Sequence, residues 1–293
     1  MFIESEHAYI KFLEFPVWEM CKDKLALSGE NIMLTPENFP VPKTGFREFK
    51  NTLLHDDGII FQDQMLKIEY KSMYKGPEVK IAIQFVSTSG NLTIRRANIE
   101  QIEGLKMTMS PIKVAEHPQL MMTGVCTGIV NKPPVIMMKY TQNAQERSLE
   151  FCLPIFIHKF LNPLALEESK HRAFWHEYST TNNASMFKLD EFIPNPAGPG
   201  VPINEVMNKI GSLLGGGLRI KANAWPNQEN CKQVWGSAQY CYKPEGEIVQ
   251  LPFLIEAEGY EEFPEHIRLG IRAGGSPFIA QSFFQILLLF LQT

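Results

Sequence analysis

The feature that most constrains the fold is an alternation of apolar and polar residues, with a period of two, that runs through residues 58 to 153. It is most regular in residues 79–85 and 149–153, where apolar positions are separated by single polar or small ones, as in half-buried strands. About seven or eight short strands with no helical period between them predict two antiparallel sheets packed face to face. The further predicted strands are 65–74, 92–100, 124–130 and 134–142.

The period changes after Pro154, where helices join the strands. Residues 164–178 are compatible with a first helix, and Phe174 with Trp175 would face its core side. A second helix is predicted at 203–214, because apolar residues recur every three or four positions before Gly215 ends the pattern. This half is predicted to be α+β, an antiparallel sheet with helices packed on it. Its other predicted elements are strands at 218–225, 233–242, 247–258 and 267–272, and a closing helix at about 277–291.

These patterns divide the chain into three parts. Residues 1–45 are mixed and turn-rich, and we expect a leader or the end of a hinge there. Residues 46–153 are expected to form the β-sandwich lobe. Residues 154–293 are expected to form the α+β lobe.

Composition excludes several classes of protein. With 20% charged residues and a net charge of -4, the chain has no basic stripe for a phosphate backbone, so no nucleic-acid partner is expected. The N-terminus lacks a signal-peptide pattern, and the apolar stretch 278–291 is shorter than the roughly 20 residues that span a bilayer. Widely spaced cysteines without a CxxC pair indicate buried thiols in a reducing, cytoplasmic compartment. The five cysteines are Cys21, Cys126, Cys152, Cys231 and Cys241.

No catalytic signature stands out. Residues 211–217 are rich in glycine but lack the Gly-Lys-Ser/Thr ending of a phosphate-binding loop, and they follow a helix instead of preceding it. His171 and His176 are five residues apart and so do not share a helix face as metal ligands. His55 and the two aspartates after it are explained by a polar turn before the first strand. Neither an enzyme, a metal nor a cofactor is therefore expected.

The strand at 267–272 (Ile-Arg-Leu-Gly-Ile-Arg) is the most informative one. Its apolar residues face one way, so Arg268 and Arg272 face the other, about 13 Å apart, and form a basic ridge. Two arginines can hold a peptide carboxylate through charge-assisted hydrogen bonds, while an exposed tryptophan offers a slot for an aromatic ring. The alternative, also open, is that these arginines pair with Glu256, Glu258 or other surface acids.

Three segments resemble a known family, the C-terminal appendage, or ear, of alpha-adaptin, the large subunit of the plasma-membrane clathrin adaptor complex. Residues 57–72 are similar to the family's first strands. Residues 149–163 are similar to its crossing into the second lobe, an apolar strand that runs into a Lys-Phe-x-x-Pro turn. Residues 267–272 and the helix after them look like its closing strand and helix. The order of these segments between residues 46 and 293 carries the resemblance.

The resemblance implies an immunoglobulin-like β-sandwich joined to a platform lobe of antiparallel sheet and helices. It implies a protein-interaction module without enzymatic activity, which recruits endocytic accessory proteins through short motifs built from Asp with Phe or Trp. The module would act in the cytoplasm at plasma-membrane clathrin-coated pits. It would join the other adaptor subunits through a trunk that this chain lacks, so we expect a fragment, and it would meet the membrane only indirectly.

The resemblance also implies a peptide site on the platform lobe. Trp175 occupies the place of the family's central tryptophan, and Glu258, Arg268 and Arg272 match its acidic residue and two arginines. Two positions depart from the family pattern. The phenylalanine one turn before the tryptophan is replaced by His171 and Arg172, for which Phe174 could substitute, and an arginine two residues before the glutamate is replaced by Glu256. A second site on the sandwich lobe cannot be placed from the sequence.

Other interpretations remain open at this point. The ears of beta-adaptin and of the coatomer gamma subunit share the two-lobed fold and a related platform site. A hydrolase or small-ligand carrier on a sandwich scaffold would need a convergent polar pocket, which no sequence cluster indicates. A purely structural role would depend on assembly through residues 1–45.

Overall fold

The computed structural model describes residues 46–113, 117–180, 185–198, 200–224, 232–260 and 263–291. The expected leader at 1–45 lies outside these residues, as do Cys21 and Cys231. The three cysteines within them, Cys126, Cys152 and Cys241, are buried free thiols, as their spacing predicts.

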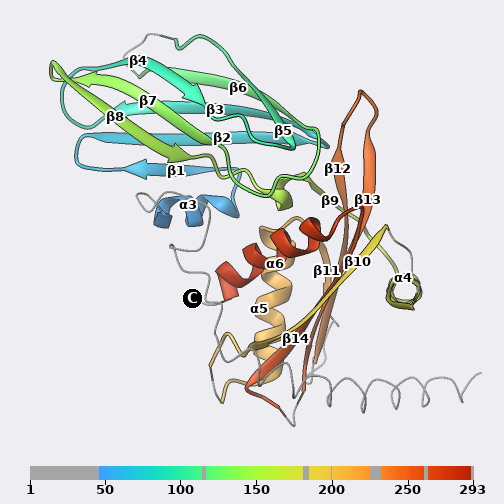
Figure 1. The fold of residues 1–293 in the computed structure, drawn as a ribbon. Helices are drawn as coiled ribbons and strands as arrows, with labels where there is room; N and C mark the ends of the chain where they lie inside the picture. The colour runs from blue at the N-terminus through green and yellow to red at the C-terminus, as the bar shows by residue number, and fades with distance from the viewer. Residues whose placement is uncertain are drawn as a thin grey trace, which may run out of the picture.

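The first lobe is a β-sandwich, as the alternation predicts (Figure 1). Its strands are β1 (Asp57–Gln62), β2 (Leu66–Lys75), β3 (Glu78–Ser87), β4 (Leu92–Ile99), β5 (Leu105–Met109), β6 (Gln119–Cys126), β7 (Val135–Gln142) and β8 (Gln145–Cys152). A five-stranded sheet in the order β1-β2-β3-β6-β5 packs on a three-stranded sheet in the order β4-β7-β8, with all pairings antiparallel. Ile81, Ile83 and Phe85 of β3 point into the core between the sheets. We call β1 to β8 the sandwich lobe.

Three features of the sandwich lobe differ from the sequence prediction. A helix, α3 (Phe46–Leu53), precedes β1 and packs Phe49 and Leu53 into the core. Strand β5 was not predicted. Strand β6 ends near the point where the predicted strand 124–130 was centred. One of its solvent-facing positions is Met121, which is apolar. The alternation of apolar and polar residues is therefore broken in β6, and the start of the strand was not recognised.

The second lobe is α+β, which confirms the predicted fold class. Its strands are β9 (Leu161–Pro163), β10 (Met186–Pro194), β11 (Lys221–Ala224), β12 (Gln233–Tyr242), β13 (Val249–Gly259) and β14 (His266–Gly274). Its helices are the 3-10 turn η1 (Ile157–Phe160), α4 (Glu168–Thr180), α5 (Ile203–Gly216) and α6 (Pro277–Leu291). The strands form one antiparallel sheet in the order β10-β14-β13-β12-β11, with β9 paired to β12. We call this part the platform lobe.

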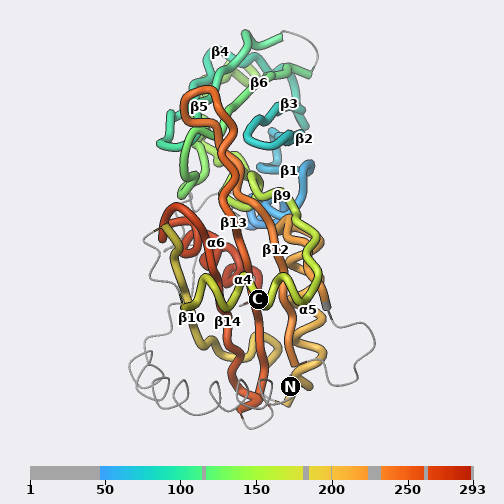
Figure 2. Tube along the Cα trace, turned by 90° about the vertical axis from the view of Figure 1, so that its right-hand side faces the viewer, coloured from blue at the N-terminus to red at the C-terminus, as the bar shows by residue number. Residues whose placement is uncertain are grey.

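The helices cover the two faces of the platform sheet unequally. Among the described elements, helices α5 and α6 lie on one face and α4 lies on the other (Figure 1). Figure 2 shows α4 crossing in front of the strands. The predicted second and closing helices are confirmed, and α6 is a core helix with a largely buried apolar surface. No helix in the described part of the chain is both long enough and apolar enough to cross a membrane.

Two predictions for the platform lobe were wrong in detail. The first helix begins at Glu168, so Leu164 and Leu166 belong to the segment before it. Strand β10 was missed, although it pairs with β14 along its whole length. It is the edge strand of the sheet, and half-exposed or exposed residues occupy most of its positions, so its apolar residues do not form a clear stripe.

Direct contacts join the two lobes. The Tyr240 hydroxyl on β12 donates to the Gly128 carbonyl at 2.7 Å, and the Lys243 amide donates to the Cys126 carbonyl at 2.7 Å. The buried hydrophobic residues of both lobes also form one continuous cluster. The two lobes therefore share a core, and the domain boundary placed at residue 153 stays a prediction.

Candidate functional site on the α4 face of the platform sheet

The strand register places the charged residues of the platform sheet in rows beneath α4. Residues directly opposite each other on antiparallel strands point to the same face. Gly270 of β14 lies opposite Asp190 of β10 on one side and Glu256 of β13 on the other. One row further along, Arg268 lies opposite Glu258, and in the other direction Arg272 lies opposite Leu254 and Lys188. This face therefore carries both predicted arginines and three carboxyl groups.

Trp175 of α4 packs down onto the centre of these rows. A Cβ atom built on Gly270 would lie 2.9 Å from two atoms of the Trp175 ring, so only glycine allows the ring to lie this close to the sheet. Trp175 is consequently 6% exposed. The expectation of an exposed tryptophan slot was wrong, because the strand beneath the helix leaves room for the ring.

Arg272 is held between Trp175 and the edge of the sheet. Its guanidinium carbon lies 4.2 Å from the centroid of the Trp175 ring, a cation–π contact. Its Nε donates to the Ser179 hydroxyl at 2.9 Å, and its Nη2 lies 3.0 Å from a carboxylate oxygen of Asp190. Its Nη1 donates to the Ile271 carbonyl at 3.0 Å. All three guanidinium nitrogens of Arg272 therefore have acceptors.

Arg268 bridges two carboxylates. Its Nη1 lies 2.8 Å from Glu258 and its Nη2 lies 2.8 Å from Asp190. Burial works against the charged guanidinium, but Glu258 and Asp190 outweigh it and raise the pKa of Arg268 above its ordinary value. The Tyr260 hydroxyl donates to the same Glu258 oxygen that Arg268 contacts. Of the two interpretations left open by the sequence, pairing of the arginines with acids of the sheet is the one found.

His171 lies on the side of α4 that faces the sheet, where it is buried. Its ring stacks near Trp175, with 5.9 Å between centroids, and near Trp235, with 4.4 Å between centroids. Its Nδ1 lies 3.6 Å from a carboxyl oxygen of Glu256. Burial lowers the pKa of His171 to about 4, and burial together with the Glu258 charge raises the pKa of Glu256 to about 8. At neutral pH both groups are therefore uncharged.

The outer surface of α4 carries the remaining predicted residue and an aromatic pair. Arg172 is exposed and forms a salt bridge with Glu168 one turn earlier at 2.8 Å. Phe174 and Tyr178 stack with 5.9 Å between centroids and 8° between ring planes. Phe174 is 37% exposed, so the core-facing interpretation was wrong, and the alternative, that Phe174 substitutes for the family's phenylalanine, stays a prediction. Phe174 points outward because the helix turns Trp175 toward the sheet.

The structure thus brings together four of the six predicted site residues: Trp175, Glu258, Arg268 and Arg272. His171 contacts Trp175 from below, and Arg172 lies apart on the outer surface. Sequence reasoning missed Asp190 and Ser179, which contact the arginines. Asp190 could have been found only by recognising β10, whose residues 187, 189 and 193 are apolar at odd positions.

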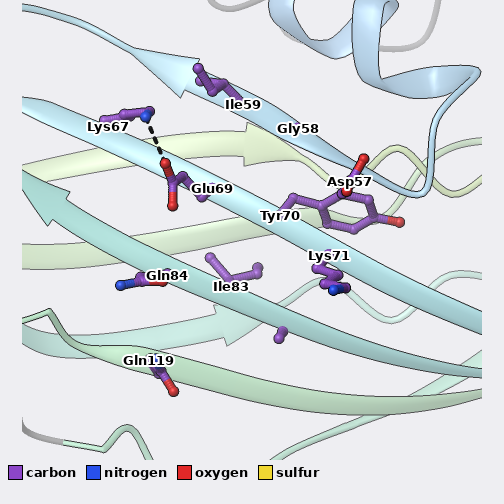
Figure 3. A pocket seen from close by; sticks show the side chains of 11 residues that line it. Asp57, Gly58, Ile59, Lys67, Glu69, Tyr70, Lys71, Ile83, Gln84 and Gln119 are labelled. Carbon is purple, nitrogen blue, oxygen red and sulfur yellow. Dashed lines mark ion pairs between the residues drawn. The ribbon is translucent and has the colours of Figure 1, made fainter.

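A separate open hollow of about 600 Å³ lies on the outer face of the five-stranded sheet of the sandwich lobe (Figure 3). Its lining mixes polar and apolar side chains and includes a Lys67–Glu69 ion pair of 2.6 Å. The lining gives no slot bounded by aromatic rings. Among the described residues, no group of three or more His, Cys, Asp or Glu side chains could hold a metal ion.

Comparison with known proteins gives one partial match in sequence. No family model matches the chain. The AP-2 complex subunit alpha-2 of Dictyostelium discoideum is 26% identical over 132 residues, which cover 43% of this chain and 13% of that protein. The chain therefore matches only a small part of the relative's length.

A solved structure, the GAE domain of GGA2p from Saccharomyces cerevisiae, is 16% identical with a TM-score of 0.26. It covers 33% of this chain and 97% of its own, a loose likeness. The sequence match and the two-lobed fold agree with the resemblance found in the sequence. The chain is therefore similar in sequence to part of an adaptor alpha subunit, in agreement with its resemblance to the alpha-adaptin appendage.

Proposed function

We propose that this chain is an adaptor appendage that recruits endocytic accessory proteins during formation of clathrin-coated vesicles, by binding short peptide motifs that combine Asp with Phe or Trp. The observation that carries the proposal is the α4 face of the platform lobe, where one helix links a partly exposed aromatic pair to two arginines. Phe174 and Tyr178 form the pair, and Ser179 of the same helix contacts Arg272. A motif with a ring and a carboxylate close together matches both features.

Each residue has a defined part in this mechanism. A ring of the motif packs against Phe174 and Tyr178, and desolvation of that ring supplies most of the affinity. The motif carboxylate is held near Arg268 and Arg272 by charge-assisted hydrogen bonds. Trp175 helps to hold Arg272 in position through the cation–π contact.

Such a contact is weak on its own. Ordering a disordered peptide costs several kcal/mol, so we expect a dissociation constant on the order of micromolar or weaker. Recruitment then depends on several motifs in each partner and several appendages in each coat, which together raise the avidity by roughly 10² or more. The rest of the adaptor complex would supply the link to other subunits and, indirectly, to the membrane at coated pits.

The experiment is a titration of labelled peptides that carry Asp-Pro-Phe or Phe-x-Asp-x-Phe. Phe174→Ala and the double variant Arg268→Gln with Arg272→Gln are expected to weaken binding about tenfold or more. Trp175→Ala is expected to weaken it too, provided that the variant remains folded. Met137→Ala is the control, because Met137 is 43% exposed on β7 of the other lobe and should leave binding unchanged.

Absence of saturable binding to the intact protein would refute this motif class. An equal loss in Met137→Ala and Phe174→Ala would show that binding lies elsewhere. Binding of motifs taken from partners of the beta-adaptin or coatomer appendages, in preference to these peptides, would assign the chain to a sister coat instead.

A further inference from the structure

Asp190 lies between the two arginines of the α4 face. One of its carboxylate oxygens is 2.8 Å from Nη2 of Arg268, and the other is 3.0 Å from Nη2 of Arg272. It comes from β10, the edge strand of the described sheet, and its own side chain is 36% exposed. Asp190 is thus partly open to solvent and bound to two guanidinium groups. The carboxylate of an acidic ligand would make the same contacts in this site.

We propose that Asp190 is an internal competitor that occupies the place of a partner's carboxylate, so that an acidic motif binds the platform lobe by displacing it from Arg268 and Arg272. This inference rests on the proposed function and adds the residue that limits its affinity. A guanidinium group is a planar fork whose donors have fixed positions, and the Nη2 atoms of both arginines contact Asp190. A peptide carboxylate that takes these two donors gains its bonds only as Asp190 gives up its own.

The arginines do not depend on Asp190 alone for their position. Arg268 keeps its bond to Glu258 at 2.8 Å when Asp190 turns away. Arg272 keeps the Ser179 hydroxyl, the Ile271 carbonyl and the face of Trp175. The remaining contacts hold both side chains in place, so the site would stay formed and become more positive.

The charge balance of the site favours the same interpretation. With Glu256 uncharged, the two arginines are paired with the carboxylates of Asp190 and Glu258, and Lys188, opposite Arg272, is a further basic side chain of the same face. A bound peptide carboxylate would bring a second negative charge close to Asp190. Turning Asp190 out to water avoids this repulsion, and its exposed position on an edge strand makes that movement local.

The test compares Asp190→Asn with Glu191→Gln. Both variants remove one negative charge from β10, but Glu191 is exposed and its neighbour position on the strand directs it to the opposite face. Each protein is titrated with a labelled Phe-x-Asp-x-Phe peptide and with the same peptide carrying Asn in place of Asp. Asp190→Asn is expected to bind the acidic peptide about tenfold more tightly than the wild type, with little change for the Asn peptide. Glu191→Gln should differ from the wild type by less than about twofold.

The outcomes separate this inference from the proposed function. If the wild type binds, and Asp190→Asn binds equally or more weakly, Asp190 is a positioning residue. The inference is then overturned while the proposed function stands. If both carboxylate variants gain equally, the effect is one of net charge and the inference is again overturned. If no protein binds either peptide, the proposed function itself fails. Should Asp190→Asn not fold, Asp190→Ser removes the same carboxylate, and the same comparison applies to it.

Discussion

Two clusters in the described residues each place one carboxylate between two basic side chains, and they differ in which parts of the chain they connect. On the α4 face, Asp190 lies between Arg268 and Arg272, and Arg272 stacks on Trp175. At the junction of the lobes, Asp56 lies between Lys159 and Arg219, and Arg219 stacks on Tyr74 with 4.5 Å from its guanidinium carbon to the ring centroid.

The junction cluster connects distant parts of the chain. Asp56 follows α3, Lys159 belongs to η1 and Arg219 follows α5, so one carboxylate joins three segments. Lys159 is 1% exposed and also donates to the His55 carbonyl at 2.6 Å. Burial lowers the pKa of Lys159 to about 8 although Asp56 counteracts it. Asp190, in contrast, joins neighbouring strands that already share a ladder of backbone hydrogen bonds. Similar chemistry thus joins distant segments at the junction, whereas on the α4 face we propose that it can be given up to a ligand.

The largest effect is expected at the junction. Asp56→Ala leaves the buried Lys159 and its neighbour Arg219 without their shared carboxylate, so it should lower the free energy of unfolding by about 3 kcal/mol. Urea denaturation measures the loss, and the adjacent exposed Asp57→Ala is the control, with an expected change below about 0.5 kcal/mol. A loss from Asp190→Ala as large as that from Asp56→Ala would break the comparison.

The next effect tests how the α4 face is built. Gly270→Ala places a Cβ atom 2.9 Å from the Trp175 ring and from an Asp190 oxygen, so the tryptophan must shift. We expect a loss of about 2 kcal/mol, as for overpacked sites, measured by urea denaturation. Gly216→Ala is the matched control, since a Cβ there meets nothing within 4 Å, and it should be neutral or slightly stabilising. Equal stability of the two variants would contradict the close packing of Trp175 on β14.

A smaller effect depends on pH. Because the folded pKa of Glu256 is raised to about 8, the folded state binds its proton where the unfolded state has lost it, and stability falls as pH rises toward 8. His171, with its pKa lowered to about 4, acts in the opposite direction below pH 6.5. The fall should therefore show between pH 6.5 and 8, by about 1–2 kcal/mol.

Glu256→Gln should remove most of this fall, because its amide stays neutral. Urea midpoints at pH 6.5 and 8 measure it for both proteins. A wild-type protein whose stability does not change over this range, with a variant that behaves identically, would show that Glu256 ionises normally.

The smallest effect concerns Arg172. Its salt bridge with Glu168 is exposed, so Arg172→Ala should cost about 0.3 kcal/mol of stability. If the peptide site lies where the arginines of β14 are, this variant should also change peptide affinity by less than about twofold. A tenfold loss of peptide binding would add Arg172 to the proposed site, beside Phe174 and Tyr178.

The alternation of residues 267–272 was enough to predict that Arg268 and Arg272 share a face, because that property is local to one strand. It could not predict their pairing with Asp190, because that pairing requires β10 to lie beside β14, a strand more than 70 residues later in the chain. The exposure of Trp175 was misjudged for a similar reason. Whether a tryptophan on a helix faces water or a sheet depends on the residue across from it, here Gly270, almost a hundred positions later in the chain.

The hairpin of β12 and β13 continues past the platform sheet and runs beside the sandwich lobe (Figure 1). Tyr240 and Lys243, near its tip, are bonded to the sandwich lobe, while Trp235 and Glu256 of the same two strands lie beneath α4. The same two strands therefore connect the residues beneath α4 directly to the sandwich lobe, with no intervening loop between Trp235 and Tyr240.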